Sequence, residues 1–262
     1  MTEIISTERV GRVVVATLSR PPVNAFNEEL ITRFETVLDA LMNDEEAVLL
    51  HIRSALPVFC AGADLALMQS CFATPDGPEV MIGVVRRMQR LFARIETAPF
   101  LTMAEIGGAA MGGGLEMALA CDLRVAAAEA RLGLPEVTLG LVPAAGGTQR
   151  LTRLCGRGIA NRLILGGEIV DGATAERLGL VQWARPRAEL ATWTAELAAR
   201  CAGVPRAAVA ANKRCLAAAG DPARDGFAEE IAGTLDLYRH PETRRRVSEF
   251  LEKSTKKNSA SK

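Results

Sequence analysis

The chain has 262 residues, of which 49% are hydrophobic, so it can bury a sizeable core. Its 31 Lys and Arg residues balance its 31 Asp and Glu residues, so no overall field attracts nucleic acid or an anionic membrane. We therefore expect one α/β domain with an appendage, no nucleic-acid partner and no membrane association.

The cysteine pattern and the N-terminal segment bear on the compartment. No CxxC pair and no Cys/His ligand spacing occurs, and the opening MTEIISTERVGRV lacks the basic and apolar regions of a signal peptide. We expect reduced thiols, a cytoplasmic protein and no metal site. The six cysteines are Cys60, Cys71, Cys121, Cys155, Cys201 and Cys215.

Hydrophobic patterning along the chain predicts alternating strands and helices. Buried strands are predicted from apolar, β-branched runs at 12–18, 48–53, 101–106 and 123–127. Amphipathic helices are predicted between them at 28–42, 79–97 and 113–120. This alternation is typical of an α/β core whose strands are largely covered by helices.

The second part of the chain has a different pattern. From about residue 157 it becomes helical and alanine-rich, and we expect the sheet to end there. The polar end STKKNSASK has the composition of a disordered tail. The predicted organisation is a core over 1–190 that holds the active site, a helical region over 191–253 and a disordered tail over 254–262.

Three consecutive glycines, Gly112 to Gly114, lead into a short apolar helix that carries one acid, Glu116. Without Cβ atoms this turn lets a ligand approach the backbone, and a helix start directs free N–H groups toward an oxygen that becomes negative. The alternative is a glycine turn packed on a strand, with Glu116 on a solvated face. Against it, Glu116 is the only polar side chain of that helix, where burial raises a pKa toward the range useful for proton transfer.

A second acid and a second small-residue loop complete the set of candidate groups. Glu136 follows Pro135, which also suits an ordinary first helical turn, and the later PAAGGTQRL offers further backbone donors. The loop 59–65 follows a predicted strand, and Asp64 there also suits a plain helix cap. Together these segments provide two backbone donors and two carboxylates.

These residues resemble the enoyl-CoA hydratase/isomerase family, also called the crotonase family. The resemblance extends from about Val13 to Lys253, and its motifs occur in the order typical of the family. They are SRPPVNAFN, VFCAGADLALM, GGAAMGGGLEMALACDLRVA, LGLPEVTLGLVPAAGGTQRLTRL and GEIVDGATAERLGLV.

The resemblance implies a crotonase-like spiral of ββα units with a helical C-terminal region that assembles a trimer or a dimer of trimers. It implies an oxyanion hole for the acyl-CoA thioester oxygen, formed by the N–H groups of Ala61 and Gly113. Glu116 and Glu136 take the places of the two catalytic glutamates of hydratases. No cofactor is implied, because coenzyme A enters as part of the substrate. The substrate-binding residues implied are Val23, Ala25, Ala61, Ala63, Asp64, Leu65, Gly112, Pro135 and Ala144.

Two departures from the family pattern concern acyl specificity rather than the reaction type. Gly107 and Ala109 stand in a stretch that usually reads N-G-Y-A, and Ala144 replaces a common glycine, where a positive φ would be unfavourable. The expected reaction is syn addition of water to a trans-2-enoyl-CoA, giving a 3-hydroxyacyl-CoA. The alternatives are a Δ3-Δ2-enoyl-CoA isomerase, a hydratase of branched or substituted substrates, and a non-catalytic acyl-CoA-binding scaffold.

Overall fold

The computed structural model describes residues 3–259, and the chain divides into two compact units between Ala202 and Gly203. The division follows helix α7 (Arg187–Ala202), whereas the sequence placed a boundary after residue 190. Helix α10 (Pro241–Ser259) includes residues 254–259 of the segment predicted as disordered, and 260–262 lie outside the described residues.

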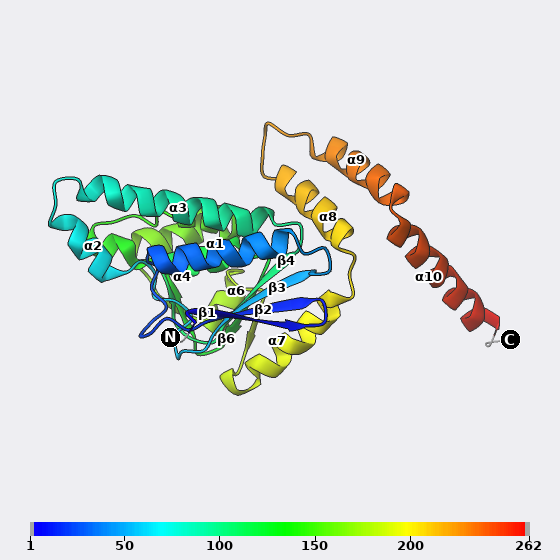
Figure 1. Ribbon diagram of the computed structural model, residues 1–262, viewed down its shortest axis with the longest axis horizontal. Helices are drawn as coiled ribbons and strands as arrows, with labels where there is room; N and C mark the ends of the chain where they lie inside the picture. The colour runs from blue at the N-terminus through cyan, green and yellow to red at the C-terminus, as the bar shows by residue number, and fades with distance from the viewer. Residues whose placement is uncertain (1–2, 260–262) are drawn as a thin grey trace. The chain divides into compact units, whose positions relative to one another are not determined.

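A six-stranded sheet forms the centre of the first unit. Strand β1 at its edge is antiparallel to β2, and the other strands run parallel to one another. Figure 1 shows α1, α3 and α4 on one side of this sheet and α7 on the other, so the inner strands are buried on both faces, as their continuous apolar runs predict. In sheet order the strands are β1 (Ile5–Val10), β2 (Val13–Leu18), β3 (Leu49–Ser54), β4 (Leu101–Ile106), β6 (Leu123–Ala127) and β9 (Trp183–Arg185).

The prediction that the sheet ends near residue 157 is wrong. Strand β9 adds a parallel edge next to β6, and β8 (Val170–Asp171) joins a second, three-stranded sheet with β5 (Ala110–Met111) and β7 (Arg131–Gly133). Strands of two or three residues are too short to show a hydrophobic period. The four long strands predicted at the core are confirmed, with end points that differ by at most one residue.

Successive turns of the chain repeat a strand–strand–helix pattern. Each of two turns places one strand in the large sheet, one in the small sheet and then a helical segment: β4, β5 and α4 (Gly113–Ala120), followed by β6, β7 and the 3-10 helix η1 (Pro135–Leu139). The preceding turn adds a parallel bridge from Cys60 to Ala110. Because β5 and β7 run parallel, the residues that follow these two strands lie side by side at one edge of the small sheet, whereas β8 is antiparallel to β7.

The remaining helices of the first unit cover the sheets. Helix α1 begins where the Asn27 side chain accepts the Leu30 N–H, and its buried face follows the 3.6-residue period that predicted it. These helices are α1 (Glu28–Met42), α2 (Leu65–Phe72), α3 (Gly77–Thr97), α5 (Gly147–Ala160), the π-helix η2 (Asn161–Leu165) and α6 (Gly172–Arg177).

The second unit consists of α8 (Arg206–Ala218), α9 (Gly226–Arg239) and α10. All three begin within the region predicted to be helical, 191–253. Helices α8 and α9 approach closely at Gly233, where an added Cβ would lie 3.6 Å from the Cβ of Ala211. None of the described helices is long and apolar enough to cross a bilayer.

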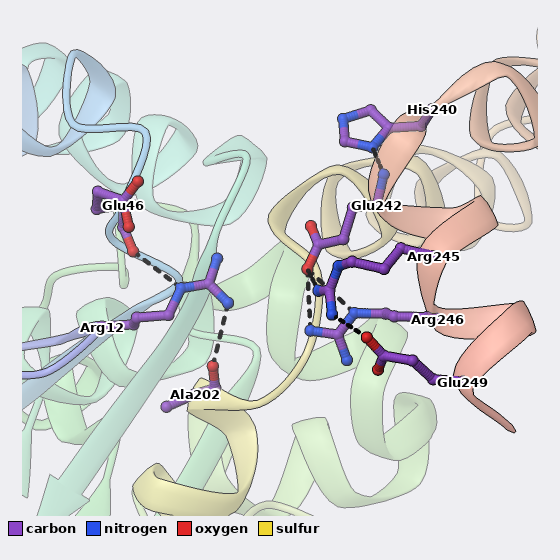
Figure 2. Close-up of polar contacts among 8 residues, drawn as sticks. All are labelled: Arg12, Glu46, Ala202, His240, Glu242, Arg245, Arg246 and Glu249. Atoms are coloured by element: carbon purple, nitrogen blue, oxygen red, sulfur yellow. Dashed lines mark hydrogen bonds and ion pairs between the residues drawn. The ribbon is translucent and has the colours of Figure 1, made fainter. Parts of the chain in front are cut away.

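Hydrogen bonds connect elements within each of the two units (Figure 2). In the first unit, Arg12 Nε donates to Glu46 O and its Nη1 donates to Ala202 O, both at 3.3 Å, which ties the β1–β2 turn to the end of α7. In the second unit, Arg246 donates to Glu242 Oε1 at 2.9 and 3.0 Å, one helical turn away in α10.

Candidate active site

The loop after Cys60 presents a different N–H group from the one predicted. The Ala61 N–H donates to Val23 O at 3.0 Å, so it is already satisfied by the backbone. Phe26 N donates to Gly62 O and Asp64 N donates to Phe26 O, which leaves Ala63 N–H facing away from this pairing. Within the described residues the Ala63 N–H has no acceptor. The prediction that the Ala61 N–H is available to a ligand is therefore wrong, and the N–H of this loop that lacks an acceptor among the described residues is that of Ala63.

The glycine triplet lies directly against that loop. Gly112 has φ 50°, and Gly113 begins α4, where the first N–H groups have no partner inside the helix. A Cβ added to Gly113 would lie 3.7 Å from Ala63 N, and one added to Gly62 would lie 3.2 Å from Gly113 N. The structure thus brings the Ala63 and Gly113 donors together at the edge where the turns of the chain stack.

Glu116 is buried in α4, with 3% of its surface exposed. Its Oε1 accepts the Gly147 N–H at 2.7 Å. Burial raises the pKa of Glu116 from its ordinary 4.5 to about 7; the charge of Glu136 also raises it, while the N–H groups of Gly147 and Ala145 and the charge of Arg150 lower it. A carboxyl group with this pKa exchanges a proton readily near neutral pH.

Glu136 approaches from η1 on the other side of the glycine turn. A Cβ added to Gly112 would lie 2.8 Å from Glu136 Oε1, so this carboxylate lies against the glycine turn, and the φ of 50° at Gly112 favours glycine there. Burial raises the pKa of Glu136 as well. Its Oε2 is buried and has no hydrogen-bond partner among the described residues, which is costly unless a ligand or water occupies the adjacent space.

The turn in PAAGGTQRL directs its backbone N–H groups to Glu116 rather than to Glu136. The sequence suggested that its backbone donors flank Glu136, but Gly147 N–H binds Glu116. Ala144 does not adopt the positive φ that would strain an alanine; among the described residues only Asn24, outside the glycines, does so. Its N–H has no acceptor within the described chain and its carbonyl accepts Gln89 Nε2 at 2.6 Å. Pro135 begins η1 and fixes the position of Glu136.

The segment before α1 fixes the donor loop from the other side. Arg20 Nη2 donates to Asp64 Oδ2 at 2.7 Å and its Nη1 donates to Ala25 O at 2.9 Å. Asp64 caps α2 through the N–H groups of Ala66 and Leu67, and Leu65 is 67% exposed. These contacts bring four of the residues predicted to bind the substrate close to Ala63: Val23, Ala25, Asp64 and Leu65.

A second group of buried polar side chains lies away from the two acids, between the large sheet and α7. His51 Nε2 lies 2.9 Å from Glu105 Oε2, which also accepts Thr194 Oγ1 at 2.5 Å. Across the residues that the structure describes, no group of three His, Cys, Asp or Glu side chains could hold a metal ion. At the first departure from the family pattern, a Cβ added to Gly107 would meet only Leu190 at 3.8 Å, so a side chain would fit there.

Comparison with known proteins identifies the family. The model of the enoyl-CoA hydratase/isomerase family matches residues 8–259. This chain belongs to that family. The predicted crotonase-like fold is confirmed by an enoyl-CoA hydratase structure from Bacillus anthracis, with a TM-score of 0.88 and 30% identity, covering 96% of this chain and 97% of that one.

Similar sequences carry hydratase names. A probable mitochondrial enoyl-CoA hydratase of Arabidopsis thaliana is 42% identical over 171 residues, 64% of this chain and 55% of that protein, so the match spans about half of its length. The 2,3-dehydroadipyl-CoA hydratase of Escherichia coli K12 is 33% identical over 263 residues, covering 97% of this chain and 98% of the relative.

Proposed function

We propose that this chain is an enoyl-CoA hydratase that adds water reversibly across the double bond of a trans-2-enoyl-CoA to give a 3-hydroxyacyl-CoA. The observation that carries the proposal is the convergence of two carboxyl groups, the buried Glu116 and the half-buried Glu136, on a glycine turn beside two N–H groups without acceptors. Many acyl-CoA reactions need a polarised thioester, but adding water also needs one group to take a proton and another to give one.

The thioester oxygen binds between the Ala63 and Gly113 N–H groups in this proposal. Negative charge that develops on that oxygen as water attacks C3 is stabilised there by the fixed dipoles of the two N–H groups. Loss of one such donor typically costs about 3 kcal/mol of transition-state stabilisation. The thioester is then activated without any metal or organic cofactor, and we propose that none is required.

Glu116 binds the attacking water and takes its proton, and Glu136 gives a proton to C2. Burial raises the pKa of Glu116 to about 7, and the N–H groups of Gly147 and Ala145 limit that rise, so the ionised form is available near neutral pH. Glu136 has a buried Oε2 with no donor in the described chain, which favours its protonated form. Ala144 N–H adds a third contact for the water, on the same turn that binds Glu116. The two acids titrate as a coupled pair that holds one proton between them.

Coenzyme A lies along the backbone of Val23 to Ala25 and of Ala63 to Leu65 in this proposal. The exposed Leu65 side chain and the Ala63 N–H, which has no acceptor in the described chain, support contact with an extended ligand. The names of the relatives include short-chain, methylglutaconyl and 2,3-dehydroadipyl substrates, so the acyl group varies among proteins that share this fold. The acyl group of this chain is left to experiment.

We also propose assembly as a homotrimer or a dimer of trimers, in the cytoplasm. Exposed apolar side chains recur along α9 at Phe227, Ile231, Leu235 and Tyr238, a spacing that forms one stripe on a helix. No disulfide links the six cysteines within the described structure, which agrees with a reducing compartment. Sedimentation equilibrium measures the assembly directly, and a monomer at micromolar concentration contradicts it.

Loss of enoyl absorbance with a panel of trans-2-enoyl-CoA thioesters tests the reaction. We expect hydration by the wild type, and a loss of turnover in Glu116→Gln and in Glu136→Gln with acyl-CoA affinity retained. Full hydration by either variant contradicts the assignment. A gain of absorbance from a 3-enoyl-CoA without hydration indicates an isomerase instead, and binding without turnover indicates a scaffold. The same panel, varied in chain length and branching, identifies the acyl group.

A further inference from the structure

The turn Ala144–Gly147 carries the N–H groups that bind Glu116, so its orientation decides how that carboxylate is held. Gly147 N lies 2.7 Å from Glu116 Oε1, and the Ala145 N–H acts on the same carboxylate. A turn of small residues has little side-chain packing of its own. Its peptide planes therefore depend on contacts made to their carbonyl oxygens.

Helix α3 supplies the first of those contacts. Gln89 Nε2 donates to Ala144 O at 2.6 Å. The Ala144 carbonyl and the Ala145 N–H belong to one planar peptide unit and point in opposite directions. A donor that fixes the carbonyl on the α3 side therefore aims the Ala145 N–H toward Glu116.

Arg150 supplies the second contact. Its Nη1 donates to Ala145 O at 3.1 Å, while Nε and Nη2 donate to Glu96 Oε2 at 3.0 and 2.8 Å. The Arg150 side chain is 11% exposed, whereas that of Glu96, near the end of α3, is 45% exposed. A Cβ added to Gly146, which has φ 109°, would lie 2.2 Å from Arg150 Nη1. The guanidinium thus fills the space left by that glycine and joins the turn to α3.

We propose that Gln89 and the Arg150–Glu96 pair are positioning residues, which hold the Ala144–Gly147 turn so that its N–H groups keep Glu116 ionised and oriented toward the attacking water. This inference rests on the proposed hydratase function. None of the three side chains contacts the reacting atoms. Gln89 and Arg150 bind carbonyl oxygens of the turn, and Glu96 holds the Arg150 guanidinium in place.

The arrangement also links the two halves of the site through one helix. Met88, next to Gln89 in α3, has its Cε 2.8 Å from the position that a Gly113 Cβ would take. The same turn of α3 therefore contacts the Gly113 donor and, through Gln89, the backbone behind Glu116. The charged groups that act on Glu116 are Glu136 from η1 and Arg150 from α5, and Arg150 is paired in turn with Glu96 from α3.

Two substitutions separate positioning from general support of the fold. Gln89→Leu removes the donor at an exposed site and leaves an apolar side chain in its place. Arg150→Lys keeps the positive charge, but a single ammonium group cannot bridge Glu96 and the Ala145 carbonyl as the planar guanidinium does. The matched control is Gln149→Leu, because Gln149 lies next to Arg150 and, among the described residues, its side chain donates only to the Thr148 hydroxyl, at 3.1 Å.

The expected result is a displaced pH profile. In Gln89→Leu and Arg150→Lys the acid limb of kcat moves to higher pH by about one unit, because the ionised form of Glu116 loses part of its stabilisation, and kcat at neutral pH falls roughly tenfold. We expect KM within about twofold of wild type, because acyl-CoA contacts lie elsewhere. Gln149→Leu keeps the wild-type profile.

An infrared titration of the buried carboxyl band that Glu116→Gln removes gives a readout independent of turnover. If the wild type hydrates enoyl-CoA but both variants keep its pH profile and band titration, the positioning inference is wrong and the proposed function stands. If the wild type does not hydrate any substrate but the band titration moves in Gln89→Leu, the proposed function is wrong and the turn still controls Glu116. The inference is also wrong if kcat/KM falls by the same factor at every pH while the acid limb of the pH profile stays where it is in the wild type.

Discussion

Glu116→Gln is expected to make the folded chain more stable while it removes activity, and the gain depends on pH. Glu116 is 3% exposed, and burial together with the charge of Glu136 raises its pKa from 4.5 to about 7, against the opposing N–H groups of Gly147 and Ala145. Folding therefore disfavours the ionised carboxylate relative to the unfolded chain. Glutamine has a similar shape, keeps an oxygen for the Gly147 N–H and does not ionise.

The magnitude and sign follow from proton linkage. For an acid whose pKa is raised by folding, its contribution to stability is fully present below the unfolded pKa of 4.5 and is lost as pH rises toward about 7. The change over this window is about 3 kcal/mol for the wild type. The variant lacks this dependence. The difference in unfolding free energy, variant minus wild type, therefore rises by about 3 kcal/mol across the same window.

Urea unfolding of both proteins between about pH 4.5 and pH 8 measures that difference. Glu105→Gln is the contrasting variant. Burial alone would raise the pKa of Glu105, but hydrogen bonds from His51 and Thr194 hold it below 4.5. Its stabilising contribution is present above pH 4.5 and is lost in acid, so Glu105→Gln destabilises the fold at neutral pH. If Glu116→Gln and wild type lose stability in parallel as pH rises, the burial argument for Glu116 fails.

Three further substitutions test the rest of the site. Glu136→Gln should lower kcat by roughly a hundredfold or more with calorimetric acyl-CoA affinity retained. Gly113→Ala should lose turnover but keep its Tm, because the new Cβ comes closer than 3.4 Å to one atom alone, the flexible end of Met88 at 2.8 Å. Gly114→Ala should instead unfold more easily, since its Cβ would lie 2.2 Å from a backbone oxygen. An amide-to-ester replacement that removes the Ala63 N–H should lower kcat by about a hundredfold. The same replacement at Ala61 should cost about 1 kcal/mol of stability and leave kcat unchanged. If kcat instead falls with the replacement at Ala61 and not with the one at Ala63, Ala61 is the donor.

Sequence patterning predicted the elements that are long enough to show a period. The helices at 28–42 and 113–120 and the strands at 101–106 and 123–127 have the predicted bounds. Strands of two or three residues in the small sheet escaped prediction, because their pairing depends on neighbours distant in the sequence. That small sheet brings the segments that follow its strands next to one another. The sequence therefore predicted which segments carry the candidate residues but not how these segments come together.

Glu116 was identified from the chemistry of its surroundings, whereas Glu136 was assigned its role by the family resemblance, and the backbone partners of both acids were not predicted. A lone carboxylate in an apolar helix is visible in a sequence, because burial of such a group requires a reason. Which N–H groups face it depends on peptide orientation, and that is set by side chains such as Gln89 and Arg150 from other elements. No local pattern marks those residues.

The position of the donor in the loop after Cys60 depends on one glycine. In a regular extended segment the N–H groups of residues two apart point the same way, so Ala61 and Ala63 would both face the Val23–Phe26 segment. Gly62 has φ 95° and breaks this alternation, so that Ala61 and Asp64 bond to that segment while Ala63 N–H turns toward Gly113. A Cβ at Gly62 would also lie 2.9 Å from Met111 O. Gly62 thus determines the donor geometry as much as the glycine triplet does: it gives Ala63 its direction and lets the two loops come within reach of one oxygen.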